Sequence, residues 1–546
     1  MADDSFDVII IGGGNKGLIA AMYLTKYGGM SVGIFEEKHE LGGGWCSEES
    51  PAPGFIADHC SHVHGLYSYH KPVYEDFPEW EEYGAKYGIW PVSIGAIFRE
   101  DDTWIGLYPE KLDPNQERTA KLIARFSQKD ADTWLYLWDK TKKYYLPAII
   151  EWLYNPPPPF GTPDPIERLV ANPDAGLDPV WFFMSGAQIY RDLFESPEAQ
   201  VLFARGIQAA GFSPEQYGIG FGTLLMIILT AIGCGVALGG NHHVAHACQR
   251  VILENGGKIY TRTPVEKILI ENGKAKGIKL SDGSEVEAKK LVLSGVDPYQ
   301  LCINLIGKEY LSEKIIRRIE NIERGWITIT WYTWALHERP KYKAEGFEPG
   351  VEGTGMLHLA TKNLDDLVKE AYQRRMGLMP DPDKLNIFTS DTTQADPSSA
   401  PPGKATVLTE QWVLPAWSMS ESEWKKFEKK HAQDLIKIWQ KYAPNMTWDN
   451  VIGFNPVTPH YTANFAKNYG PAGNWGVIDM CGSQMGRFRP IPELANHRTP
   501  IKGLYGSGAA WHPMPGAHGM QGYNCYKILS EDLGLRKPWE EKGAPW

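Results

Sequence analysis

The alternation of hydrophobic and polar positions at the start of the chain predicts a strand, a glycine turn and a helix. Residues 7–11 form a short apolar run, DVIII, and the turn GGGNKG follows it directly. The next segment, LIAAMYLTKYGG, repeats apolar residues at helical spacing and ends at the stop signal Gly28-Gly29. A second apolar run, SVGIF, leads to Glu36, so the pattern predicts a βαβ unit of about thirty residues.

The pattern changes twice farther along the chain. From about residue 95 to 239, aromatic helices broken by proline-rich turns predict an inserted subdomain. Residues 244–257 predict a helix, and alternating runs at 258–295 predict strands and hairpins that return the chain to a sheet. Residues 499–533 again have the pattern of a strand, a glycine-rich turn and a helix. This order is typical of a doubly wound nucleotide-binding fold that is interrupted by a second region.

Composition and charge exclude several classes of function. The chain has 546 residues, 43% of them hydrophobic and 22% charged, which suits about two to four ordinary globular domains. Its 55 Lys and Arg against 66 Asp and Glu give a net charge of −11, so no nucleic acid partner is expected. Its 20 Trp and 26 Tyr suit either an aromatic-rich core or a roomy apolar ligand cavity.

The cysteines and the N-terminus favour a cytoplasmic protein. The seven cysteines are scattered and contain no C-x-x-C pair, which argues against a disulfide framework. The first residues, Met-Ala-Asp-Asp, run directly into an apolar strand without the pattern of a signal peptide. We therefore expect a reducing, cytoplasmic location.

One uncharged segment bears on membrane contact. Residues 216–241 carry no charged side chain, and the run TLLMIILTAIGCGV within them approaches the length of a membrane span. Its glycines and the globular pattern on both sides favour a buried helix. The alternatives are a helix that dips into a membrane or lines a tunnel, and a true span. Peripheral membrane contact is therefore the second option for the location of the protein.

A glycine motif indicates dinucleotide binding. Gly12, Gly14 and Gly17 form the pattern G-x-G-x-x-G between the predicted strand and the predicted helix. In that setting the first glycine permits a tight turn, the second lets the backbone approach a pyrophosphate, and the third lets helix and strand pack closely. Glu36 ends the second strand, where its carboxylate can accept hydrogen bonds from a ribose diol.

A second glycine cluster extends this motif to one family. Gly42-Gly43 begins six residues after Glu36, a spacing that separates FAD-binding proteins from most proteins that bind NAD on the same fold. The chain resembles the FAD-dependent phytoene desaturase branch of the amine oxidase superfamily, including its pyridine-nucleotide-disulfide-oxidoreductase-like members. The likeness covers nearly the whole chain, through DVIIIGGGNKGLIAAMYL, ERTAKLIARFSQKDADTW, GGKIYTRTPVEKILIENGKAKGIKLSDG, VLSGVDP and RPIPELANHRTPIKGLYGSGAAWHP.

The resemblance implies an α/β fold, in which a Rossmann-type, doubly wound FAD-binding domain carries an inserted α+β substrate or cap domain. With the pattern above, this places the FAD-binding domain in residues 1–95, 240–300 and 480–546, and the cap domain in residues 96–239 and 301–479. The residues implied to bind FAD are Gly12, Gly14, Gly17, Glu36, Gly42, Gly43, Val265 at the adenine, Gly508 near the ribityl chain, and Gly519 and Met520 near the isoalloxazine.

The late glycine-rich turn departs from the family pattern. Relatives carry T-H-P-G-G-G where this chain has Trp-His-Pro-Met-Pro-Gly-Ala-His-Gly at 511–519, so larger and ionisable groups replace glycines. Histidine exchanges protons readily near neutral pH. The resemblance implies that His512 and His518 lie beside the flavin, where either could take a proton from the substrate. The alternative is that they hydrogen-bond the flavin or the loop backbone.

A histidine cluster follows the second glycine pair. In the segment DHCSHVH at 58–64, alternate residues of an extended chain would face the same side, so His62 and His64 could converge with Cys60. A metal site, a polar role in the active site and structural histidines are the alternatives. The resemblance implies that this stretch runs beside the flavin and substrate cavity. We therefore expect no metal, and the candidates for the cavity wall are His59, His62, His64 and Trp511.

The expected function is that of an FAD-dependent dehydrogenase or desaturase acting on a hydrophobic, isoprenoid or alicyclic small molecule. No G-x-S-x-G, H-E-x-x-H or G-K-[ST] motif supports a hydrolase, a zinc protease or a kinase. No second G-x-G-x-x-G is present for NAD(P)H, so the electron acceptor is oxygen, a quinone or a partner protein. An oligomer or a partner subunit stays open. The alternative functions are a redox-neutral isomerase or hydration catalyst, an amine oxidase, and a non-enzymatic binding protein for prenylated partners.

Overall fold

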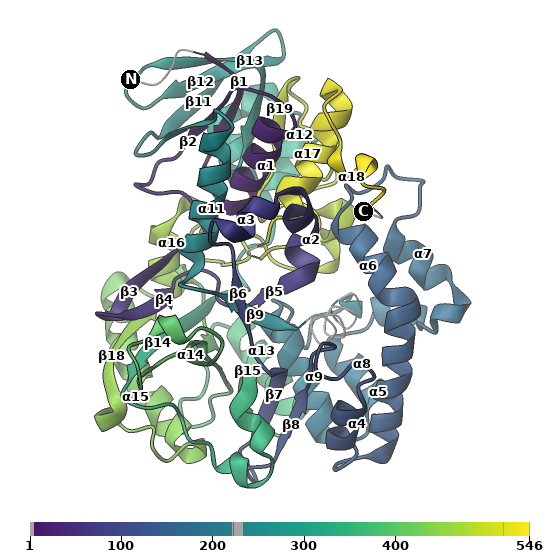
Figure 1. Ribbon diagram of the computed structural model, residues 1–546, viewed down its shortest axis with the longest axis vertical. Helices are drawn as coiled ribbons and strands as arrows, with labels where there is room; N and C mark the ends of the chain where they lie inside the picture. Colours follow the sequence, from purple (N-terminus) through teal and green to yellow (C-terminus); the bar gives the residue numbers. More distant parts are fainter. Residues whose placement is uncertain (1–4, 221, 223–232, 517, 545–546) are drawn as a thin grey trace.

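The computed structural model describes residues 5–220, 222, 233–516 and 518–544 of the chain. Within these residues, two large sheets of seven strands each lie at opposite ends of the molecule, and helices pack against both of them (Figure 1). One buried hydrophobic cluster contains residues from both ends, such as Val8 in the first sheet and Leu408 in the second. The two regions therefore share a core.

The first sheet has the order β10-β2-β1-β13-β12-β11, and β19 pairs with β13. The strands from β10 to β13 and β19 are parallel, whereas β11, β12 and β13 form an antiparallel series. Val8 and Ile10 belong to one buried cluster, while Ile9 and Ile11 belong to another, so β1 is covered on both faces. The strands are β1 (Ser5–Ile11), β2 (Val32–Phe35), β10 (Lys258–Tyr260), β11 (Val265–Glu271), β12 (Lys274–Leu280), β13 (Glu285–Ser294) and β19 (Leu504–Gly506).

Helix α1 (Asn15–Lys26) lies along this sheet between α11 (Asn241–Glu254) and α17 (Met520–Leu533), as Figure 1 shows. A Cβ atom on Gly17 would lie 2.8 Å from the Gly12 carbonyl oxygen, so only glycine lets α1 approach the end of β1 so closely. The other helices around this sheet are α2 (Leu66–Asp76), α3 (Pro78–Glu82), α12 (Glu313–Glu320) and α18 (Pro538–Glu541).

The second sheet has the order β18-β14-β17-β16-β15-β7-β8. Its side chains alternate between two environments, as the period of a strand requires. On β14, Tyr332 and Trp334 belong to the buried cluster around helix α15 (Glu421–Tyr442), whereas Ile329 and Trp331 belong to the central core. The strands are β7 (Val92–Phe98), β8 (Trp104–Leu107), β14 (Ile329–Leu336), β15 (Thr354–Ala360), β16 (Ile387–Asp391), β17 (Ala405–Trp412) and β18 (Val451–Val457).

A layer of helices, α4 to α9, lies beside the second sheet (Figure 1). Helix α9 contacts β7, β8 and β15 directly. The helices of this layer are α4 (Glu117–Ile123), α5 (Gln128–Lys140), α6 (Leu146–Leu153), α7 (Pro165–Ala171), α8 (Gly186–Leu193) and α9 (Pro197–Ala209). Three further helices are α13 (Leu364–Arg375), α14 (Thr392–Ala395) and α16 (Pro459–Phe465). Short strands β3 (Ser47–Ala52) and β4 (Phe55–Asp58) pair with each other, and β5 (His64–Gly65), β9 (Cys234–Ala237) and β6 (Tyr87–Ile89) form a three-stranded sheet.

The predicted fold class, a doubly wound α/β domain with an inserted second domain, is confirmed. Two boundaries differ from the sequence pattern. Helix α11 begins at Asn241 rather than 244, and the predicted domain boundary at 95 falls inside β7, which belongs to the second sheet. No helix among the described residues is long and apolar enough to cross a membrane. Within the uncharged segment 216–241, residues 221 and 223–232 lie outside the described residues, and with them most of the run TLLMIILTAIGCGV that was predicted to be a helix.

Candidate functional site

The acid at the end of β2 is bound to the glycine turn that follows β1. Glu36 accepts the Gly13 backbone N–H at Oε2 (2.7 Å) and the Lys38 backbone N–H at Oε1 (2.9 Å). Burial raises the pKa of Glu36, and the two N–H groups act against this shift. The carboxylate therefore has a fixed position beside the glycine turn.

The second glycine pair lies against the first. Gly42 donates its N–H to the Gly13 carbonyl oxygen (2.8 Å), and Asn15 donates its N–H to the Gly42 carbonyl oxygen (3.1 Å). A Cβ on Gly43 would lie 3.0 Å from the Gly14 Cα, so the two turns meet backbone to backbone. Gly14 is the N-cap of α1, and nothing lies within 4 Å of where its Cβ would be. The turns form one cradle at a helix N-terminus, with open space in front of it.

A cavity of about 900 Å³, counted to its open mouth, begins at this cradle. Gly12, Glu36, Gly43 and Val265 are among the residues that line it. Four residues that sequence reasoning assigned to the adenosine half of FAD thus share one cavity.

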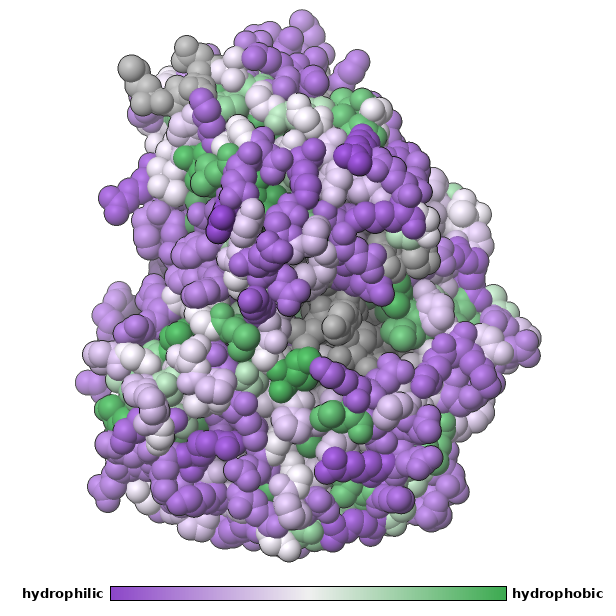
Figure 2. Space-filling model, in the orientation of Figure 1, coloured by the Kyte–Doolittle hydropathy of each residue, from purple (hydrophilic) through white to green (hydrophobic). Residues whose placement is uncertain are grey.

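A larger cavity of about 1350 Å³, also counted to its open mouth, continues from the first. Six residues contribute to the lining of both cavities: Gly14, Gly43, Gly295, Val296, Ala466 and Asn468. Gly508, which the resemblance placed near the ribityl chain, and Trp511, a candidate for the cavity wall, line the larger cavity. The two cavities together form one path from the glycine cradle into the space between the two sheets. Apolar residues border the junction between the two ends on the face seen in Figure 2.

The far wall of the larger cavity is one face of the second sheet. Adjacent strands contribute side chains of the same register to it, as the alternation of β-strands predicts. These residues are Ile329 and Trp331 on β14, Leu408 and Glu410 on β17, Phe388 on β16 and Met356 on β15. The wall is therefore apolar except for the Glu410 carboxyl group and the Trp331 indole N–H.

Four polar donors on the cavity wall lack partners. They are Asn15 Nδ2 and the indole Nε1 atoms of Trp331, Trp475 and Trp511, which are buried and make no hydrogen bond within the described part of the chain, although all four residues line the larger cavity. Buried donors are nearly always satisfied, so these four indicate a ligand with hydrogen-bond acceptors in the cavity.

The predicted histidine cluster separates in the structure. His62 lines the larger cavity, with Nδ1 3.4 Å from Asp58 Oδ2 and Nε2 3.0 Å from Ser390 Oγ. His64 instead has its Nε2 2.8 Å from Asn241 Oδ1 on α11. His59 is buried at β4, where burial lowers its pKa, and its ring stacks on that of Tyr461. Of the three, only His62 is on the cavity wall.

No metal centre is formed by these side chains. Among the described residues, no group of three or more His, Cys, Asp or Glu side chains could hold a metal ion.

In the glycine-rich turn at 511–519, the two histidines are not the residues that face the cavity. His512 Nε2 lies 3.0 Å from the carbonyl oxygens of both Trp152 and Asn155, and burial lowers its pKa to about 4. His518 Nε2 lies 2.9 Å from the Pro515 carbonyl oxygen. Neither ring is among the residues that line the cavity, so the structure favours the alternative of backbone hydrogen bonds. Their catalytic role stays a prediction.

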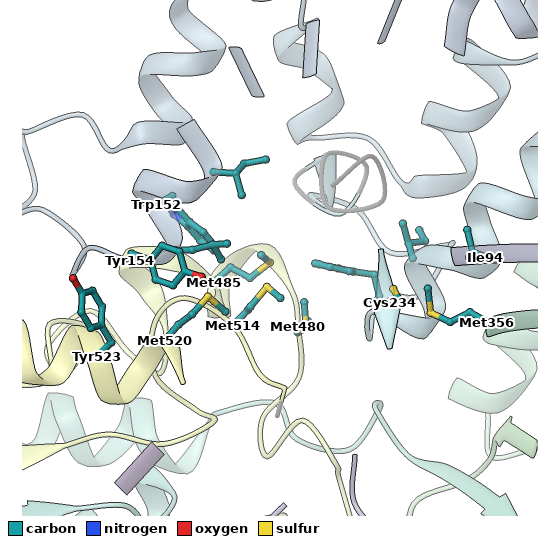
Figure 3. Packing of buried hydrophobic residues seen from close by; sticks show 14 of the residues in the cluster. Ile94, Trp152, Tyr154, Cys234, Met356, Met480, Met485, Met514, Met520 and Tyr523 are labelled. Atoms are coloured by element: carbon teal, nitrogen blue, oxygen red, sulfur yellow. The ribbon is translucent and has the colours of Figure 1, made fainter. Parts of the chain in front are cut away.

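The start of α17 also lies away from the cavity wall. Gly519 and Met520 are buried, and a Cβ on Gly519 would lie 3.1 Å from Ile19 Cγ1 of α1. Figure 3 shows Met520 grouped with Met485 and Met514 beside the end of α6, in the buried core. Their predicted position near the isoalloxazine is therefore not supported by the residues that line the cavity.

The ionisable residues on the cavity wall that were not predicted include Lys16 and Glu410. Lys16 donates from Nζ to the Gly516 carbonyl oxygen, and burial lowers its pKa to about 7. Burial raises the pKa of Glu410 to about 7, against the effect of the Arg205 charge. The position of Glu410 could have been predicted from the segment VLTEQW at 407–412, because the alternation of a strand places Glu410 on the same face as Leu408.

Known proteins similar to this chain include a nucleotide-binding domain family and several oxidoreductases. Residues 10–80 match the family model of an NAD(P)-binding Rossmann-like domain. The chain is 27% identical to pyridine nucleotide-disulfide oxidoreductase domain-containing protein 2 of Mus musculus, over 97% of this chain and 94% of that protein. It is 25% identical to a limonene dehydrogenase subunit of Castellaniella defragrans, over 98% of this chain and 96% of that protein. A shorter match, 25% identical over 53% of each chain, is to a 4,4'-diapophytoene desaturase of Methylomonas sp.

Solved structures share the fold. An oxidoreductase from Methanosarcina mazei has a TM-score of 0.59 with 20% identity, over 96% of this chain and 99% of that chain. Putrescine oxidase bound to putrescine has a TM-score of 0.58 with 14% identity, over 97% and 99% of the two chains. These matches confirm the expected resemblance to desaturase-like and amine oxidase-like oxidoreductases and the expected fold class. The residue roles stay predictions.

Proposed function

We propose that this chain is an FAD-dependent dehydrogenase or desaturase that removes a hydride and a proton from a hydrophobic, isoprenoid or alicyclic substrate. The observation that carries the proposal is the continuous cavity, which begins at the glycine cradle and Glu36 and ends at the apolar face of the second sheet. Similarity along nearly the whole chain to a protein named as a limonene dehydrogenase subunit supports the substrate class.

The adenosine half of FAD would be held by the smaller cavity. Gly12, Gly14 and Gly43 leave room for the pyrophosphate at the N-terminus of α1, where backbone N–H groups and the helix dipole favour an anion. Glu36 would bind the ribose diol and Val265 would contact the adenine. Bound FAD supplies the acceptor for the hydride.

The substrate would bind against the sheet wall of the larger cavity. Phe388, Leu408 and Met356 offer apolar contacts, and the Trp331 indole N–H is the one hydrogen-bond donor among these four side chains. Burying a ligand there removes apolar surface from water, worth about 25 cal/mol per Å². The chain thereby orients the substrate and excludes water from the reacting carbons.

The electrons leave to an acceptor that the chain alone does not define. One relative is named as a dehydrogenase subunit, which supports a partner protein as the acceptor. Oxygen and a quinone are the alternatives. The proposal is tested by the visible spectrum of the purified protein, which should show an oxidised flavin band, and by anaerobic addition of limonene and related compounds, which should bleach it. A colourless protein would instead support a binding role.

A further inference from the structure

Glu410 is the one acidic side chain on the sheet wall of the larger cavity within the described residues. Across the sheet, Trp331 pairs with Glu410, Glu410 with Phe388, and Phe388 with His358. The carboxyl group therefore lies in a row between two aromatic side chains that also line the cavity. A charged residue in the middle of an apolar ligand wall needs a physical reason, because burying it without a partner is costly.

Two other carboxyl groups, the half-buried Glu370 and the buried Asp297, accept hydrogen bonds at both oxygens. Glu370 on α13 accepts from Asn386 Nδ2 (2.7 Å) and Gln411 Nε2 (3.0 Å) at its two oxygens. Asp297 in the cavity wall accepts the N–H of Tyr299 (2.9 Å) at one oxygen and the side-chain amide of Gln300 at the other. These groups have structural roles.

Glu410 differs from them. Its carboxyl group accepts no hydrogen bond from any described residue, and its side chain lines the cavity next to Leu408. A half-buried carboxyl group with a free face toward a ligand cavity is the arrangement of a proton-transfer group.

We propose that Glu410 is the base that accepts the proton from the hydrophobic substrate. This rests on the proposed function. A Glu410 carboxylate oxygen takes a proton from one substrate carbon while a hydride leaves the adjacent carbon for bound FAD. The electron pair of the broken C–H bond forms the new C=C bond. The two hydrogens are thus accounted for as one proton on Glu410 and one hydride, with its two electrons, on the cofactor.

The surroundings suit such a group at neutral pH. Because burial raises the pKa of Glu410 to about 7, both protonation states are accessible there. The cation that acts on it is Arg205 of α9, whose Nη1 donates to Gln208 Oε1 (2.6 Å) and whose own pKa burial lowers. His358 of β15 has its pKa held well below its usual range by burial and by Arg205, so this ring is neutral.

The other charged groups around the cavity have partners of their own. The charge of Glu370 on α13 interacts with Arg205 and raises the pKa of its guanidinium group. From the first domain, Asp58 and His62 line the same cavity, and they are paired with each other at 3.4 Å. None of these groups is in hydrogen-bond contact with Glu410, so its protonation state responds chiefly to burial and to what occupies the cavity.

The test compares Glu410→Gln with Glu370→Gln in the flavin-containing protein. Glu370→Gln is the matched control, because it removes another carboxyl group that interacts with Arg205 but does not line the cavity. We expect Glu410→Gln to slow anaerobic flavin reduction by the wild-type substrate about 10²- to 10⁴-fold, the usual contribution of a positioned base. The rate of Glu370→Gln should stay within about threefold of wild type, and both variants should keep their flavin.

Two further readouts distinguish a base from a merely structural residue. In the wild type, the reduction rate should rise with pH to a plateau above about 7, and this dependence should be absent in Glu410→Gln. Infrared difference spectra of the protein without substrate should show a neutral carboxyl band that disappears near the same pH in the wild type and is missing from Glu410→Gln. Binding of p-menthane, a saturated non-reacting analogue of limonene, should be unchanged.

The outcomes separate the two proposals. Wild-type reduction rates in Glu410→Gln would overturn the role of Glu410 and leave the dehydrogenase function standing. A wild-type flavin that no hydrophobic compound reduces would overturn the proposed function itself. Reduction by amines alone would overturn both, because Glu410 would then pair with a substrate cation. If Glu410→Gln loses its flavin, Glu410→Asp decides: a rate at least about tenfold slower with the pH dependence kept supports the base, and an unchanged rate refutes it.

Discussion

Glu36 Oε2 accepts the backbone N–H of Gly13 at 2.7 Å, so the acid at the end of β2 and the glycine turn after β1 form a single unit. The second glycine pair packs on that unit through the bond from Gly42 N–H to the Gly13 carbonyl oxygen. Residues from two separate turns thereby define the start of the cavity. The proposed FAD site depends on this arrangement of Glu36 and the two glycine turns.

Gly14→Ala should impair FAD binding without impairing the fold. Gly14 has φ of −67°, which alanine adopts freely, and no atom lies within 4 Å of the added Cβ. The methyl group would project into open space at the cradle, where the pyrophosphate is proposed to lie. We expect FAD affinity to fall at least about tenfold, or about 1.4 kcal/mol, measured by flavin titration of the flavin-stripped protein.

Gly17→Ala is the contrasting variant. Its Cβ would lie 2.8 Å from the Gly12 carbonyl oxygen, so α1 would have to move away from β1. This change should lower the free energy of unfolding by about 1–3 kcal/mol, seen in thermal melting. Equal flavin affinity in Gly14→Ala and wild type would contradict the assignment of the cradle.

Leu408→Phe should narrow the substrate end of the cavity. Leu408 lies on β17 two residues before Glu410, and its side chain lines the cavity wall. The larger ring should weaken binding of alicyclic substrates about tenfold and leave the flavin content unchanged, as measured by anaerobic titration. Leu408→Met keeps the side-chain volume and should bind like wild type. Tighter binding or loss of flavin in Leu408→Phe would place the substrate elsewhere.

His431 should make the second domain sensitive to acid. It is buried on α15, stacked on Phe427 with ring centroids 4.7 Å apart, and burial lowers its pKa to about 3. Since the unfolded chain binds a proton near pH 6.5 and the folded chain does not, the wild type should lose stability as pH falls from about 6.5 toward 3.

His431→Leu should remove that contribution. The melting temperature of His431→Leu should therefore rise relative to that of the wild type as the pH falls from about 6.5 toward 3. His39→Leu, at an exposed histidine, is the control and should show no such trend. A difference that does not change with pH would contradict the explanation.

The parts of the site that lie close together in sequence could be predicted, and the others could not. Gly12, Gly14 and Glu36 belong to one βαβ unit of local pattern, and the structure places all of them at the cavity. Trp331, Phe388 and Glu410 come from three strands whose pairing depends on the whole second sheet. No local pattern gives that register.

The late turn illustrates a second limit. The resemblance implied that His512 lies beside the flavin, and Trp511 was a candidate for the cavity wall. The structure puts Trp511 on the cavity wall but directs His512 to the carbonyl oxygens of Trp152 and Asn155 at the end of α6. Neighbouring residues in a turn can point in opposite directions. Which one faces the cavity depends on what packs behind the turn, here Trp152 and the methionines of Figure 3.

The most direct test of the central claim is an anaerobic titration of the purified protein with limonene, followed by its visible spectrum. The account predicts an oxidised flavin band at the start and its stoichiometric loss as substrate is added, with an oxidised, more unsaturated product in the extract. Absence of a flavin band, or a band that neither limonene nor any related hydrophobic compound bleaches, would contradict it.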